Sequence, residues 1–189
     1  MKNLLIIVIL ISVLGAGLTT YAQTGEVCYN PNLVKDSSKK SIKSIAEGRI
    51  GPSMVNINYH SPGVRKRIIW GGLVPFDEVW VTGAHDATTI NFDKDMLINN
   101  QRIEAGKYAL FTIPGEKEWI VIINKNFEQH LASEYDEKDD VIRINVRPQT
   151  VDHLERLQYF IEPGKNNTGS ISVVWEKKRI SFPVQVVTD

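Results

Sequence analysis

The chain has 189 residues, of which 42% are hydrophobic, a size and composition suited to one globular domain with a sizeable core. It carries 22 Lys and Arg residues against 22 Asp and Glu residues, so its formal net charge at pH 7 is zero. A surface this close to neutral gives no electrostatic reason to expect nucleic-acid binding, which requires a strong basic excess.

Residues 1–22 have the pattern of a secretory signal peptide. Lys2 opens a short basic start, residues 4–14 are almost continuously apolar, and Thr20 and Ala22 provide small residues near a cleavage site. We expect cleavage between Ala22 and Gln23, giving a periplasmic or secreted protein with no membrane span after cleavage. A retained anchor is the weaker alternative, because the apolar run is shorter than the roughly 20 residues that span a bilayer.

Residues 23–50 are predicted to form a polar leader. Residues 36–44 are rich in Ser and Lys and show no sustained apolar period. The chain's one cysteine, Cys28, lies in this stretch and cannot form an internal disulfide. In an oxidising compartment Cys28 is therefore either a free thiol or an intermolecular link.

From Ser53 onward the dominant pattern is an alternation of apolar and polar residues, which is typical of half-buried β-strands. The alternating runs are Val55–Tyr59, Ile90–Phe92, Lys107–Ile113, Ile142–Val146, Leu157–Ile161, Ile171–Trp175 and Ile180–Val186, and the run Trp119–Ile123 is continuously apolar. Gly, Pro and Asn turns separate them.

These short strands predict an all-β fold for residues 51–189, a single antiparallel β-sandwich that is jelly-roll-like. Five apolar positions of these strands should be buried, namely Leu110, Ile122, Ile144, Val173 and Trp175. The one helical stretch expected is residues 126–138, as a turn or two before an acidic loop.

Several segments together are distinctive. They are Tyr59–Pro75, with the run Trp70-Gly-Gly-Leu-Val-Pro75, then Glu78–Ile90, Ala105–Pro114, Glu118–Asn124 and the closing Trp175-Glu-Lys. Across residues 53–187 the chain resembles a family of secreted proteins abundant in Bacteroidota, the domain of unknown function 2911. The resemblance implies a secreted or periplasmic β-sandwich and no established reaction. The family pattern usually has Arg at the position of Val81 and Asn-Glu at the position of His85-Asp86.

His85-Asp86 is the sharpest polar feature of the chain. A histidine beside a carboxylate can act as an oriented base or as a ligand. However, neighbouring residues of a strand point to opposite faces, so the two side chains need not cooperate. The competing interpretation, which we favour, is that Asp86 caps the turn through its own backbone and Thr88 or Thr89.

The remaining candidates form a site hypothesis around the same junction. Trp80 and Thr82 precede it, and Arg65 and Arg67 are expected at its rim, where they are suited to an anionic ligand. Exposed tryptophans stack on sugar rings, but the glycines and valines around Trp70 and Trp80 favour core positions. No metal site or cofactor is predicted, since the four histidines show no recognised zinc spacing.

The function favoured by these patterns is non-catalytic binding of a small molecule, a glycan or an envelope partner. The first alternative is a hydrolase that uses Asp86 and His85, with or without a metal. The second is a purely structural envelope component. No nucleophile motif of the Gly-x-Ser-x-Gly type occurs in the chain.

Overall fold

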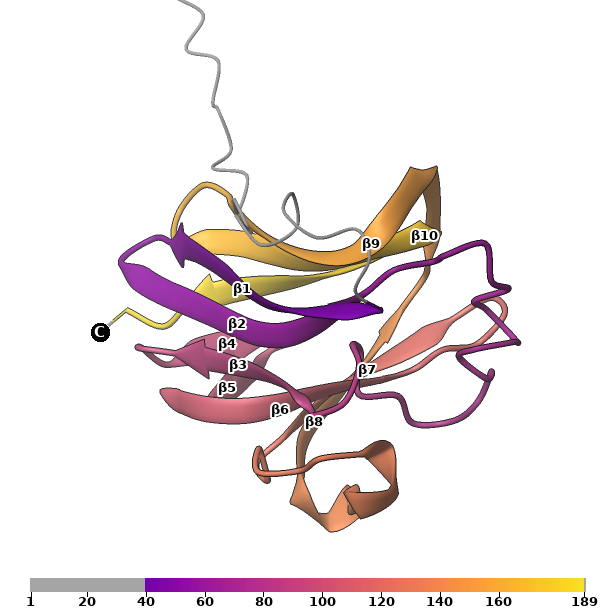
Figure 1. The fold of residues 1–189 in the computed structure, drawn as a ribbon. Helices are drawn as coiled ribbons and strands as arrows, with labels where there is room; N and C mark the ends of the chain where they lie inside the picture. Colours follow the sequence, from indigo (N-terminus) through magenta and orange to yellow (C-terminus); the bar gives the residue numbers. More distant parts are fainter. Residues whose placement is uncertain (1–39, 189) are drawn as a thin grey trace, which may run out of the picture.

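A computed structural model describes residues 40–188 and shows an all-β sandwich, as the sequence predicts (Figure 1). Within residues 40–188, ten strands form two antiparallel sheets. The strands are β1 Ser41–Ile50, β2 Ser53–Pro62, β3 Thr88–Phe92, β4 Met96–Ile98, β5 Gln101–Ile103, β6 Gly106–Ile113, β7 Trp119–Asn124, β8 Asp140–Val146, β9 Gln149–Pro163 and β10 Thr168–Val186. The six-stranded sheet has the order β1-β2-β3-β6-β7-β8, and the four-stranded sheet has the order β5-β4-β10-β9. In the described residues there is no helix long and apolar enough to cross a membrane.

The predicted leader, residues 23–50, is wrong in its last ten residues, because Ser41–Ile50 form the strand β1. Residues 41–50 pair along their whole length with β2, from Ser41 opposite Pro62 to Ile50 opposite Ser53. The inward positions of β1 include the small residues Ser44, Ala46 and Gly48, which weaken the apolar period that would reveal a strand. Within the described residues the sandwich therefore begins at Ser41, and the predicted signal peptide and Cys28 lie outside those residues.

The strand β10 reverses direction within its own length. Glu176 has a positive φ of 54°, the Ser172 hydroxyl lies 3.0 Å from that of Ser181, and the Val186 N–H donates to the carbonyl of Asn167 at 2.9 Å. The two halves of β10 thus lie side by side, which agrees with the two separate alternating runs predicted for this part of the chain.

The core lies between the two sheets and is built from their alternating inward residues. The five positions predicted to be buried are each at most 7% exposed, so that prediction is confirmed. Four of them lie between the sheets, whereas Ile122 is buried on the outer face of the six-stranded sheet. The sheets come close where β2 ends, because Gly63 forms an antiparallel bridge with Arg156 and the Ser61 hydroxyl donates to the Leu157 carbonyl at 2.7 Å.

A second, smaller apolar cluster covers part of the outer face of the six-stranded sheet. Ala109, Phe111 and Ile122 point outward and are buried by Phe127 and Tyr135 of the segment 125–139. This segment, predicted to contain a short helical stretch, has only two 3-10 turns, at Ala132–Glu134 and Glu137–Asp139. It appears below the sheet in Figure 1.

Candidate functional site

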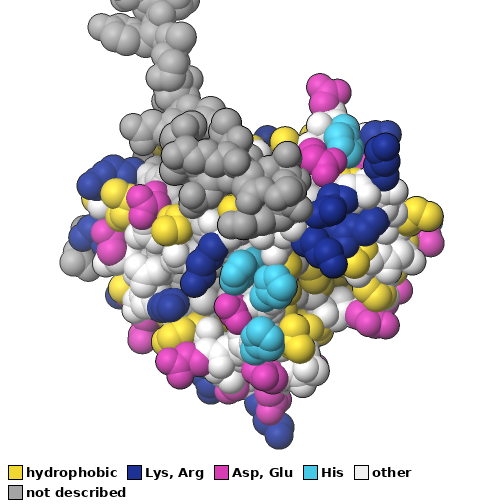
Figure 2. Space-filling model, in the orientation of Figure 1, with side chains coloured by type: hydrophobic (Ala, Val, Ile, Leu, Met, Phe, Trp, Pro, Cys, Tyr) yellow, Lys and Arg dark blue, Asp and Glu magenta, His cyan; other side chains and the backbone are white. Residues whose placement is uncertain are grey.

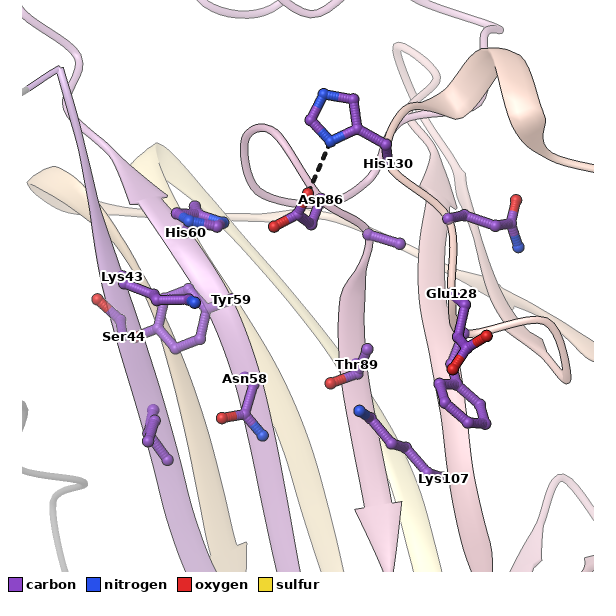
Figure 3. Close-up of a pocket in the computed structure, with 14 residues that line it drawn as sticks. Lys43, Ser44, Asn58, Tyr59, His60, Asp86, Thr89, Lys107, Glu128 and His130 are labelled. Carbon is purple, nitrogen blue, oxygen red and sulfur yellow. Dashed lines mark hydrogen bonds and ion pairs between the residues drawn. The ribbon is translucent and has the colours of Figure 1, made fainter.

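A cavity of about 680 Å³ lies on the outer face of the six-stranded sheet, beside the covered part (Figure 3). Its lining combines polar, basic, acidic and apolar groups, with Asp86 and Glu128 as the acidic ones. The residues are Lys43, Ser44, Ile45, Asn58, Tyr59, His60, Asp86, Ala87, Thr89, Lys107, Phe127, Glu128, Gln129 and His130. Its volume is within the range of roughly 300–1,000 Å³ that is usual for small-molecule sites.

The floor of the cavity is set by strand register. Ile45 of β1 pairs with Asn58 of β2, and Asn58 pairs in turn with Thr89 of β3. Residues directly opposite each other in antiparallel strands project from the same face, so the three side chains form one row across the sheet. The even-numbered residues of β1 face the core, which directs Lys43 and Ile45 outward.

Two loops form one wall of the cavity: the loop that precedes β3, with Asp86 and Ala87, and the segment 125–139 that follows β7. The Asn124 side chain holds the segment 125–139 by donating to the Asp136 carbonyl at 3.1 Å and accepting from the Asn126 N–H at 3.0 Å. The Ala87 N–H donates to the Gln129 carbonyl at 2.9 Å, which joins this segment to the loop that precedes β3. Because these contacts fix the backbone of both loops, the wall is pre-formed.

Cationic side chains enter the cavity from opposite sides. Figure 3 shows Lys43 of β1 and Lys107 of β6 pointing toward the space above Asn58 and Thr89. The Lys107 Nζ lies 4.8 Å from the ring centroid of Phe127, a cation–π distance that positions the ammonium at the wall. The cavity can therefore offer positive charge and hydrogen bonds to one ligand.

Asp86 binds a histidine other than its neighbour in the sequence. Its Oδ1 lies 2.7 Å from Nδ1 of His130, and this hydrogen bond is the main reason why the pKa of the Asp86 carboxyl is lowered. Among the described residues the Asp86 side chain thus bonds His130, and not its own backbone, Thr88 or Thr89 as the turn-cap interpretation expected. Figure 2 shows histidine side chains gathered around an acidic one at this place.

His85 contacts residues other than Asp86 through its side chain. It lies at a positive φ of 63°, its Nε2 is 2.8 Å from the Ser41 hydroxyl, and its ring contacts that of His60 edge-on with centroids 5.2 Å apart. The two neighbours therefore do not form one catalytic pair. Instead Asp86 lines the cavity together with His130, while the His85 ring packs edge-on against the ring of His60.

Trp80 and Thr82, which the sequence grouped with Asp86, belong to the core side of the sheet. Trp80 packs against Trp70, Trp119 and Trp175 with ring centroids 5.8–6.5 Å apart, and its Nε1–H donates to the Gly83 carbonyl. Thr82 is fully buried, and its hydroxyl lies 3.0 Å from that of Thr112. Neither residue lines the cavity.

Arg65 and Arg67 also lie apart from the cavity, on the loop that follows β2. The Arg67 guanidinium donates to the carbonyls of Gly63 and Val64, and the Arg65 N–H donates to Glu155 Oε1 at 2.9 Å. Of the six predicted site residues, only Asp86 lines the cavity. Among residues 40–188, no group of three or more His, Cys, Asp or Glu side chains is arranged to hold a metal ion.

The comparisons with known proteins bear on the whole sandwich. A family model described as protein of unknown function (DUF2911) matches residues 41–184. The chain belongs to this family. The match begins with β1 and ends within β10, so it covers both sheets. No curated protein and no solved structure gives a significant match.

In this DUF2911 protein most residues that line the cavity belong to no sequence motif, so motif analysis could not predict them. Asn58, Thr89 and Lys107 are single polar residues inside alternating strands, where a solvated face is the default interpretation. Once the strands are aligned, the register places them together. Lys43 was missed for a further reason, since it lies in the segment predicted to be a leader.

Proposed function

We propose that this protein is a non-catalytic binder of a small polar molecule, such as a sugar or a small organic acid, in the cavity of the six-stranded sheet. The observation that carries the proposal is the pre-formed cavity of about 680 Å³ directly over the row Ile45, Asn58 and Thr89. Its location is proposed to be the periplasm or the exterior, on the basis of the predicted signal peptide.

The chemistry of the lining supports this class of ligand. The Asn58 amide and the Thr89 hydroxyl offer donors and acceptors from the floor, and Lys43 and Lys107 offer positive charge from the sides. Ile45 and Phe127 add apolar surface to the lining, against which the C–H groups of such a ligand can pack. Such a mixture orients a polar ligand without requiring a reaction.

The test is a ligand screen read by thermal unfolding and then by calorimetry. The panel contains neutral sugars, uronic acids and small carboxylic acids, and a true ligand raises the unfolding midpoint by mass action. Thr89→Val keeps the shape of the side chain and removes its hydroxyl, so we expect binding to weaken about fivefold, the effect of a hydrogen bond worth about 1 kcal/mol. Thr150→Val, at an exposed position of β9, is the matched control.

Two outcomes would overturn the proposal. One is a panel in which no compound shifts the midpoint, which would favour a purely structural role. The other is a ligand whose affinity is the same for the wild type, Thr89→Val and Thr150→Val, since that ligand would bind elsewhere.

A second candidate function, hydrolysis, is favoured by the Asp86–His130 contact of 2.7 Å. A histidine oriented by a carboxylate is the arrangement of a general base. If the protein is a hydrolase, Asp86→Asn should lower the turnover of chromogenic ester and glycoside substrates at least tenfold. Equal turnover by both proteins, or none by the wild type, would reject this candidate and leave the binding proposal standing.

A further inference from the structure

The loop of residues 64–74 presents side chains that the core does not use. Its inward residues are firmly anchored, with Val64, Ile69 and Val74 each at most 5% exposed. Backbone hydrogen bonds hold its tip, from the Leu73 N–H to the Ile68 carbonyl at 3.0 Å and from the Val74 N–H to the Ile69 carbonyl at 2.9 Å. The loop is therefore a braced element that holds its outer side chains in place.

Two large aliphatic side chains project from this braced tip. Ile68 is 79% exposed and Leu73 is 47% exposed, and the hydrogen bond between their backbones places them next to each other. Single exposed aliphatic residues are ordinary on a protein surface. Two of them side by side on a rigid loop form a small apolar protrusion.

Three consecutive cations flank the protrusion. Arg65, Lys66 and Arg67 are all exposed, and residues 64–74 contain no Asp or Glu. The Gly63 and Val64 carbonyls fix the Arg67 guanidinium, which holds it at the surface. Figure 2 shows a cluster of Lys and Arg side chains with hydrophobic ones beside it on the same face as the histidines.

We propose that residues 64–74 dock the protein onto an anionic membrane surface. Lipid phosphates attract the three cations, and the apolar protrusion of Ile68 and Leu73 enters the boundary between headgroups and acyl chains. The combination distinguishes this surface from a nucleic-acid site, which would need a wider basic field and no aliphatic side chains. The inference is independent of the cavity and of what binds there.

The test is sedimentation of the exported protein with lipid vesicles. Vesicles of phosphatidylcholine and phosphatidylglycerol in equal parts should carry the protein into the pellet, and pure phosphatidylcholine vesicles should not. Binding should fall as salt is raised, because the attraction to the headgroups is screened.

Variants separate the two contributions. Ile68→Ser with Leu73→Ser, and separately Lys66→Glu, should each weaken binding to the anionic vesicles roughly tenfold. The matched controls are Leu131→Ser, a leucine of the segment 125–139 that is 48% exposed and does not line the cavity, and Lys117→Glu, an exposed lysine of the turn between β6 and β7. Both controls should bind as the wild type does.

The proposal fails if the wild type does not sediment with the anionic vesicles. It also fails if the loop variants and the controls bind equally. Should Ile68→Ser with Leu73→Ser instead abolish self-association of a protein that ignores vesicles, the protrusion is an interface between copies of this chain and the membrane proposal is wrong.

Discussion

The imidazole of His60 is surrounded by groups that disfavour its charged form. Burial lowers its pKa most, and the neighbouring His85, Lys43 and His130 lower it further, while Asp86 acts in the opposite direction. In the unfolded chain these influences are absent. Between the ordinary histidine pKa of about 6.5 and the lower pKa in the folded protein, the unfolded state therefore binds more protons.

From this difference we predict that stability falls as the pH is lowered from 7 to 5. The thermal unfolding midpoint, measured in steps across that interval, should decrease for the wild type and decrease less for His60→Gln. Asp86 does not affect this interval. Its pKa is lowered in the folded protein, so its carboxylate stabilises the fold above the ordinary carboxyl pKa, and this stabilisation is lost only at more acidic pH. The control is His153→Gln, at an exposed position of β9. An equal slope for all three proteins would contradict the prediction.

At the scale of the element, β1 forms the side of the cavity that lies opposite the segment 125–139. Its outward residues Lys43 and Ile45 line the cavity, and its inward Gly48 lies against β9. A Cβ added at Gly48 would lie 2.9 Å from Cβ of Ile161, closer than two carbon atoms can pack. The glycine therefore sets how closely β1 approaches the opposite sheet.

We predict that Gly48→Val destabilises the protein by about 1–3 kcal/mol, the usual cost of overpacking a core. Valine has the better strand propensity, so a gain would be expected if propensity alone decided. The measurement is urea unfolding, with Arg49→Val on the exposed face of the same strand as the control. If both variants unfold at the same urea concentration, the close approach of Gly48 to Ile161 does not contribute to the free energy of unfolding, and the prediction is wrong.

The strands with clear alternation, such as Ile142–Val146, could be predicted from the sequence because the apolar side chains themselves carry the period. β1 could not, because its inward positions are partly serine, alanine and glycine. The candidate site was predicted only at Asp86. Its partner His130 is 44 residues away, and only the packing of segment 125–139 on the sheet brings the two together. Trp80 and Thr82 stood near Asp86 in the chain, but the loop turns them to the core.

At the scale of the whole molecule, the pattern of residues 1–22 predicts that the protein is exported and cleaved. Because the apolar run of residues 4–14 is followed by small residues at Thr20 and Ala22, we predict that protein recovered from its native host begins at Gln23 or within a few residues of it. Intact-mass measurement of the exported protein is the check, with the cytoplasmic precursor as the control. An exported chain that keeps Met1 would show that the segment is not removed.

The tryptophan cluster has a consequence for how this protein can be studied. The chain has four tryptophans, and Trp70, Trp80, Trp119 and Trp175 pack with ring centroids 4.7–6.5 Å apart. At such separations excitation passes readily from one indole to the next, so their emission behaves as a single optical probe of the space between the sheets. None of the four lines the cavity. Intrinsic fluorescence will therefore report the opening of the sandwich, while an occupant of the cavity will need a spectroscopic label of its own.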